Sequence, residues 1–226
     1  MHAFLRSLIV IVLPLLVLTG CGKYDWRQKM TVVVDTPTGQ VSGASVMTSR
    51  VSDQRSPIAL PEANSVLFDV EGEAVVIQVS PGSYLFALLN EVRSLAGLLH
   101  PKMDAAESAK RLENGVGQAE SEVTLPSSEY PLLVTFNDIN DPASVKRVDP
   151  ANLEATFGPG YRLNGITLSL TKEPVTKGKV EKLLGWWTRY TDKAGRMISL
   201  RYPNKSPRGY DTLSPLDFWS LGNIPK

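Results

Sequence analysis

Cysteine is almost absent from this chain of 226 residues, in which Cys21 is the only one. A single cysteine cannot form an internal disulfide, so the fold must be stabilised by a packed core. Histidine is also scarce, because the sequence contains only His2 and His100. A zinc or iron site with several imidazole ligands needs at least two histidines, and His2 belongs to the apolar leader described below. These two shortages exclude multi-histidine metal sites and thiolate metal sites from the folded part of the protein.

Neither sign of charge is in excess. The chain has 24 Lys and Arg against 23 Asp and Glu, and a net charge of +1. Nucleic-acid-binding domains carry a basic excess, so we expect no nucleic-acid partner. The sequence also contains no P-loop, no G-x-G-x-x-G, no H-E-x-x-H and no G-x-S-x-G. We therefore expect no cofactor and assign no catalytic residue from motifs.

Long hydrophobic runs are missing except at the N-terminus. Residues 8–18 are almost wholly apolar, follow Arg6 and are interrupted only by Pro14. This run is shorter than the roughly 20 residues that a membrane-spanning helix needs, and it has the length of a signal-peptide apolar region. The pattern predicts a secretory signal over residues 1–20.

The run ends in the tetrapeptide Leu18-Thr19-Gly20-Cys21, which resembles the lipobox of bacterial lipoproteins. The resemblance implies cleavage between Gly20 and Cys21, a diacylglyceryl thioether on the Cys21 sulfur, and acylation of the new amino terminus. Two or more acyl chains give a stable membrane anchor. The alternatives are an ordinary cleaved signal with an unrelated cysteine, or an uncleaved anchor helix. Gly22 stands where inner-membrane lipoproteins carry Asp, which implies an outer-membrane location facing the periplasm.

The remainder of the chain is long enough for one sizeable domain or two small ones. We expect a lipidated tether over residues 21–29 and a single strand-rich periplasmic domain over residues 30–226. A change of character near residues 92–128, where helix-forming residues predominate, leaves a subdivision open.

Alternating or β-branched patterns predict an α+β, strand-rich fold with an antiparallel β-sandwich-like core and a few short helices. Strands are expected at residues 30–35, 40–51, 65–70, 73–79, 131–137, 161–170 and 197–202. The turns at residues 36–39 and 71–72 predict two hairpins. Helices are expected at residues 104–113, 150–157 and 177–187, whereas residues 83–89 fit either a strand or the start of a helix.

Two further resemblances concern the folded part. Residues 32–46 read V-V-V-D-T-P-T-G-Q-V-S-G-A-S-V and resemble the opening of β-sandwich modules of the carboxypeptidase-regulatory or transthyretin-like type. The likeness implies a strand, a D-x-x-G turn and a second strand. Residues 138–163 resemble a group of uncharacterised proteobacterial lipoproteins, a likeness that implies no mechanism.

The densest cluster of polar side chains contains Asp138, Asn140 and Asp141. Carboxylate and amide oxygens at such spacing occur in calcium loops and also in capped turns. The glycine that a calcium-binding EF-hand requires is absent, and Pro142 follows instead. The pattern favours turns stabilised by these side chains and leaves only a weak candidate for a metal site.

Two hypotheses for function follow. The favoured one is a lipid-anchored binding or structural module that contacts an envelope protein, with an aromatic and arginine patch at Trp186, Trp187, Arg189 and Tyr190. These aromatics would instead close the core if they are buried, which is the commoner role of such side chains.

The second hypothesis is an envelope hydrolase. Asp138, Asp141 and Glu154 would supply the acid and the base, and His100 is a further candidate base. A cleft that holds two of these carboxylates would favour this hypothesis.

Overall fold

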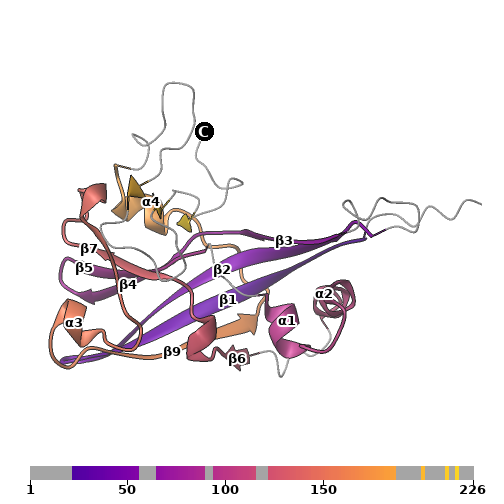
Figure 1. Ribbon diagram of the computed structural model, residues 1–226, viewed down its shortest axis with the longest axis horizontal. Helices are drawn as coiled ribbons and strands as arrows, with labels where there is room; N and C mark the ends of the chain where they lie inside the picture. The colour runs from indigo at the N-terminus through magenta and orange to yellow at the C-terminus, as the bar shows by residue number, and fades with distance from the viewer. Residues whose placement is uncertain are drawn as a thin grey trace, which may run out of the picture.

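Two antiparallel sheets face each other in the protein, with a few short helices at their margins (Figure 1). The computed structural model describes residues 22–55, 65–89, 94–115, 122–186, 200–201, 212–213 and 217–218. The first sheet has the order β3-β2-β1-β9-β6, the second has the order β4-β5-β7-β8, and β10 pairs with β11. The predicted strand-rich, sandwich-like α+β fold is confirmed.

The strands are β1 (Gly22–Thr36), β2 (Gly39–Asp53), β3 (Val66–Glu71), β4 (Val75–Ser80), β5 (Ser83–Ala87), β6 (Glu122–Thr124), β7 (Leu133–Phe136), β8 (Val145–Arg147), β9 (Arg162–Leu170), β10 (Leu200–Arg201) and β11 (Thr212–Leu213). The helices are α1 (Leu95–Leu99), α2 (Ala105–Glu113), η3 (Ser127–Glu129), η4 (Pro142–Ser144), α3 (Glu154–Phe157) and α4 (Lys179–Leu183).

The first hairpin, β1–β2, runs the length of the molecule (Figure 1). Its pairing is continuous from Gly22 opposite Asp53 to Thr36 opposite Gly39. The turn is closed by the Thr36 hydroxyl, which donates to the Gly39 carbonyl at 2.6 Å. Gly39 itself has a φ of +125°, which favours glycine. At about 3.3 Å per residue, fifteen-residue strands make this hairpin roughly 45 Å long.

The N-terminal part of β1 is where the structure differs most from the sequence-based expectation. Residues 22–29, expected to belong to a tether, form the first half of β1 and pair with β2. The inward-facing Trp26 and Gln28 are both buried. The Gln28 side-chain oxygen accepts from Trp26 Nε1 and from the Leu95 backbone N–H, each at 3.1 Å. Gln28 therefore occupies a core position with its amide hydrogen-bonded. Because it is a polar residue, it interrupts the alternation of apolar residues by which the sequence would have revealed this part of the strand.

The second expected hairpin is wrong, although both of its strands exist. β3 pairs with β2 in the first sheet, whereas β4 pairs with β5 in the second. The chain crosses between the sheets at Gly72 and Glu73. A Cβ on Gly72 would lie 2.8 Å from the Met47 Cβ, and the Ser45 hydroxyl donates to the Glu73 carbonyl at 2.6 Å. The glycine therefore allows a close passage between layers and does not form a two-residue turn.

Different elements cover the two halves of the hairpin's inner face (Figure 1). Near Gly39 the second sheet packs against it, and near Gly22 the cover is α2, whereas α1 packs on α2, β6 and β9 and reaches β1 at Gln28. The Asp25 N–H donates to Glu113 of α2 at 3.2 Å. As the sequence predicted, Asp104 caps α2, because its carboxylate accepts from the Ala106 and Glu107 N–H groups. Residues 83–87, which fitted either state, form strand β5.

An aromatic cluster covers the other face of the second sheet. Phe86 and Phe136 meet edge to face with centroids 5.6 Å apart, and Phe218 lies 5.8 Å from Phe86. The Phe218 carbonyl also accepts from the Ala74 N–H at 2.7 Å. Phe218 is thereby fixed to the residue that precedes the start of β4.

Candidate functional site

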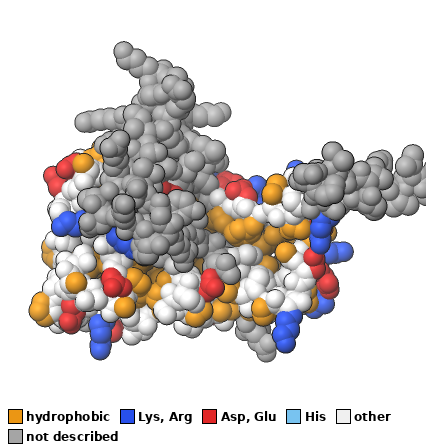
Figure 2. Space-filling model, in the orientation of Figure 1, with side chains coloured by type: hydrophobic (Ala, Val, Ile, Leu, Met, Phe, Trp, Pro, Cys, Tyr) orange, Lys and Arg blue, Asp and Glu red, His pale blue; other side chains and the backbone are white. Residues whose placement is uncertain are grey.

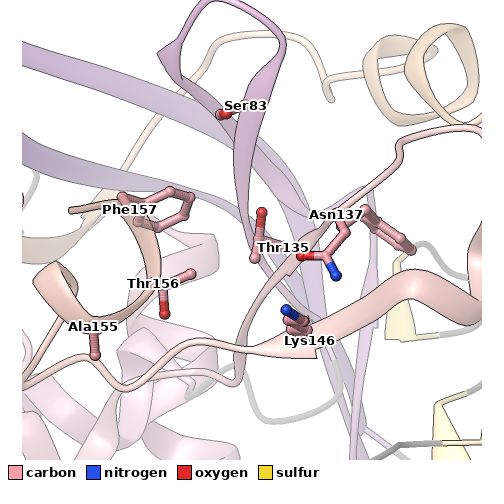
Figure 3. Close-up of a pocket in the computed structure, with 8 residues that line it drawn as sticks. Ser83, Thr135, Asn137, Lys146, Ala155, Thr156 and Phe157 are labelled. Atoms are coloured by element: carbon pink, nitrogen blue, oxygen red, sulfur yellow. The ribbon is translucent and has the colours of Figure 1, made fainter.

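A recess of about 240 Å³ lies between the second sheet and α3 (Figure 3). Its walls come from the start of β5, the end of β7, the middle of β8, and α3. The lining residues are Ser83, Thr135, Phe136, Asn137, Lys146, Ala155, Thr156 and Phe157.

Neighbouring strands place the polar groups of the recess side by side. Thr135 of β7 lies directly opposite Lys146 of β8 in the antiparallel register. The Thr135 hydroxyl donates to the Tyr84 carbonyl at 2.7 Å, and this hydrogen bond fixes the rotamer of the side chain. The lone pairs of the hydroxyl oxygen can still accept hydrogen bonds. Asn137 follows β7 and is exposed, as is Lys146. The recess therefore presents one cation, one amide and several hydroxyls beside the Phe157 ring.

These residues can bind a ligand but offer no acid–base pair. An ammonium and an amide suit a small anionic or hydroxyl-rich group, and an aromatic wall suits an apolar part of the same ligand. None of the lining residues is a carboxylate or a histidine. Sequence reasoning missed this recess because it is assembled from separate segments with no shared motif.

The acidic side chains singled out in the sequence stabilise their own loops. Asp138 Oδ1 accepts from the Asn140 N–H at 2.9 Å, and Asp141 Oδ1 accepts from the Ala143 N–H at 2.9 Å. Glu154 accepts from the Gly160 N–H at 3.0 Å. Each is an exposed group that satisfies nearby backbone. Across the described part of the chain, no three or more His, Cys, Asp or Glu side chains are grouped to hold a metal ion.

The helix expected from Pro150 begins later, at Glu154. Asp149 accepts from the Ala151 N–H at 2.9 Å and so forms a turn of its own, and Asn152 accepts from the Ala155 N–H at 3.1 Å. The aspartate–proline pair therefore starts a capped turn that precedes α3.

Trp186 does not belong to an exposed patch, so the predicted partner surface is wrong at this residue. Its side chain is only 7% exposed, its ring lies 5.8 Å from that of Phe136, and its indole N–H donates to the Ile139 carbonyl at 2.7 Å. Trp186 thus extends the aromatic cluster, which is the alternative that the sequence left open. Trp187, Arg189 and Tyr190 lie outside the described residues.

His100 connects two helices. Its Nδ1 lies 2.8 Å from the hydroxyl of Ser108, which is buried and donates its own proton to the Ala96 carbonyl at 2.7 Å. The Ser108 oxygen must therefore accept from Nδ1. Because Ser108 is buried, its hydroxyl cannot reach a substrate. The hydrogen bond between His100 and Ser108 therefore holds α1 against α2, and the two residues do not act as a base and a nucleophile.

The open end of the long hairpin carries the most exposed large apolar side chains among the described residues. We call this end the hairpin base and define it as residues 22–25 of β1, 50–53 of β2 and 66–69 of β3. Leu67 and Phe68 of β3 are 49% and 41% exposed. Figure 2 shows hydrophobic side chains gathered over β2 and β3 on the visible face.

Charged residues of the hairpin base form ion pairs with one another and with Arg55, which lies just outside it and also pairs with Asp104. Arg55 forms ion pairs with Asp53 at 2.8 Å and with Asp104 at 2.7 Å, and Arg50 lies 3.7 Å from Asp69. The hydrogen bonds from Arg55 lower the pKa of Asp104 to about 2. This end therefore combines exposed apolar residues with charges that neutralise each other.

Within the described residues, no helix combines the length and the apolar character that crossing a bilayer requires. No protein-family model, curated protein or solved structure matches the chain.

Proposed function

We propose that this protein is a lipoprotein of the bacterial cell envelope, attached to a membrane through lipid on Cys21. Its folded domain faces the periplasm from the outer membrane and acts as a binding or structural module. An envelope protein or a small envelope component is its partner.

One observation supports the proposal best. β1 begins at Gly22, the residue that follows the lipobox cysteine, and it is paired with β2 from that first residue onward. Lipid on Cys21 would therefore be joined directly to a fifteen-residue strand of the central sheet. Such an arrangement holds the domain at the membrane surface without a flexible spacer.

The contacts of the acidic residues favour a binding role over hydrolysis. Asp138, Asp141 and Glu154 each accept a backbone hydrogen bond within their own loop. General acid–base catalysis needs two such groups facing one substrate. The recess beside Lys146 instead offers one cation and hydroxyl groups, which suits recognition of an anionic or hydroxyl-rich group.

Replacing Cys21 by serine is expected to abolish lipidation, and with it the acyl anchor. A serine oxygen cannot accept the diacylglyceryl group as a thioether, and the acyl chains provide the hydrophobic free energy of anchoring, about 0.8 kcal/mol per buried CH₂. Labelled palmitate should enter the wild-type protein and be absent from Cys21→Ser, while the variant accumulates as an uncleaved precursor or in the soluble fraction. Mass analysis of the N-terminal peptide identifies the modification directly. A bare thiol on the wild-type peptide would contradict the proposal.

The outer-membrane location has its own test. Gly22→Asp introduces the residue that the lipobox resemblance associates with inner-membrane retention, so this variant is expected to move to the inner-membrane fraction on a sucrose gradient. Gly22→Ser is the matched control, because any Cβ at this position would lie 2.7 Å from the Tyr24 hydroxyl and displace that ring equally. A shift of both variants, or of neither, would contradict the sorting argument.

A further inference from the structure

We propose that the hairpin base docks on the lipid bilayer, with Leu67 and Phe68 of β3 entering its interfacial layer. The inference rests on the proposed lipidation of Cys21 and adds a protein–lipid contact to the covalent anchor. It orients the domain, because only this end of the long hairpin would touch the membrane.

The register of the sheet places both side chains close to the anchor. Leu67 lies opposite Ser52, which lies opposite Lys23, so Leu67 and Lys23 share one row of the sheet. Gly22, the first residue of β1, precedes Lys23 and is about 3.3 Å from it along the strand, and β3 is two strands from β1, about 10 Å across. The Leu67 backbone is therefore within about 11 Å of the backbone of Gly22, the residue to which the acylated Cys21 would be bonded. Apolar side chains of peripheral membrane segments enter the interface to a depth of about 5–10 Å. Side chains this close to the acyl anchor would lie near enough to the bilayer to reach that depth.

The exposure of these side chains fits a bilayer. Successive residues of a strand point to opposite faces, so exposure of both Leu67 and Phe68 means that this part of β3 is uncovered on both faces. β3 is also the edge strand of its sheet. The Phe68 ring stacks on that of Trp26 with centroids 6.4 Å apart, which holds it in place while 41% of the residue stays exposed. Tyr24 shares the row of Phe68, and tyrosine is a residue type that favours membrane interfaces.

The charges near these residues indicate an apolar contact and not attraction to anionic lipids. Arg50 and Arg55 are engaged by Asp69, Asp53 and Asp104, and Lys23 adds one further exposed cation at this end. Basic membrane-binding surfaces instead present several unpaired Lys and Arg side chains toward the headgroups. Insertion of the hairpin base should therefore be insensitive to the anionic lipid content.

A second copy of the chain fits this surface less well than a bilayer. Addition of a strand to β3 would need a free, uncharged edge, but β3 has only six residues and carries Asp69 and Glu71. Asp69 is 69% exposed, and charged side chains on an edge strand oppose pairing with another strand.

The test uses the acylated full-length protein in vesicles of phosphatidylethanolamine and phosphatidylglycerol. Because the chain has one cysteine, Leu67→Cys adds the only thiol free for a nitroxide once Cys21 carries lipid. Ser42→Cys is the matched control, since Ser42 is exposed on the same face of the sheet and lies about 33 Å farther along the hairpin. Power-saturation measurements with oxygen and a water-soluble nickel complex then report the depth of each label.

We expect the label at position 67 to lose about fivefold in collision rate with the nickel complex on reconstitution, because water is sparse at interfacial depth, whereas the label at 42 should change less than about twofold. Replacing phosphatidylglycerol by phosphatidylcholine should leave both values unchanged. A label at 67 that stays as accessible as that at 42 would overturn the contact. Protection accompanied by spin–spin broadening that grows with protein density would also overturn it, in favour of a second copy. Mass analysis separates the two proposals: if Cys21 lacks acyl groups the anchor fails, whereas an acylated protein with a water-exposed label refutes only the docking.

Discussion

Gly43→Ala is expected to lower the free energy of unfolding by about 3 kcal/mol, because the added methyl group has no room between the two sheets. An ideal Cβ at this position would lie 2.4 Å from the Val76 carbonyl oxygen and 2.8 Å from Ile77 Cγ1. The carbonyl belongs to the backbone of β4, so it cannot rotate away as the end of a side chain could. Relief requires the two sheets to move apart where they cross.

Urea unfolding followed by circular dichroism measures this loss, and the chain offers a matched control. Gly165 lies in β9 of the same sheet, and a Cβ there would meet no other atom within 4 Å. Gly165→Ala should therefore change stability by less than about 1 kcal/mol, and in the stabilising direction because alanine restricts the unfolded chain. Equal losses in the two variants, or no loss at Gly43, would show that this close approach does not determine the packing of the sheets.

Glu73→Ala is expected to cost about 2 kcal/mol, since it removes the acceptor of buried N–H groups. Glu73 is only 4% exposed and lies where the chain crosses from the first sheet to the second. Its carboxylate accepts from the Lys179 N–H at 3.1 Å and from the Val180 N–H at 3.4 Å, and these residues start α4. The side chain thereby connects two segments more than 100 residues apart.

The same residue should make stability depend on pH. Burial raises the pKa of Glu73 above its ordinary value of 4.5, and the backbone hydrogen bonds from Lys179 and Val180 oppose the rise only in part. A carboxyl whose pKa is higher in the folded state favours folding when protonated. Its stabilising contribution is complete below pH 4.5 and is lost as the pH rises through the folded-state pKa.

Glu73→Gln isolates this effect, because glutamine keeps one oxygen acceptor and does not titrate. The difference in unfolding free energy between the wild type and Glu73→Gln should drift in favour of the variant as the pH increases above 4.5. Hydrogen bonds from Arg55 lower the pKa values of Asp53 and Asp104, so these two residues make stability fall as the pH decreases. This contribution is the same in both proteins and cancels in the difference. Parallel stability curves for the two proteins would contradict the assigned direction of the pKa shift.

Several features could be predicted because neighbouring residues alone determine them. The alternation of apolar residues in β9, the turn at residues 36–39 and the capping of α2 by Asp104 all depend on interactions within a few positions. The acidic residues at 138 and 141 were likewise assigned to turns, and their hydrogen bonds reach only two residues along the chain. The lipobox is also local, and its chemistry stays a prediction.

Strand partners, burial of single aromatics and the recess were decided only by the tertiary structure. β3 and β4 follow each other in sequence yet join different sheets, because β3 extends the edge of β2 while β4 packs across Gly43. Trp186 is buried because Phe136 and the Ile139 carbonyl meet it from a distant segment. Gln28 is accepted in the core because Leu95 supplies a donor. Sequence patterns encode which face of a segment is apolar, but not which other segment will cover that face. The free energy that selects the cover comes from contacts between residues far apart in the chain.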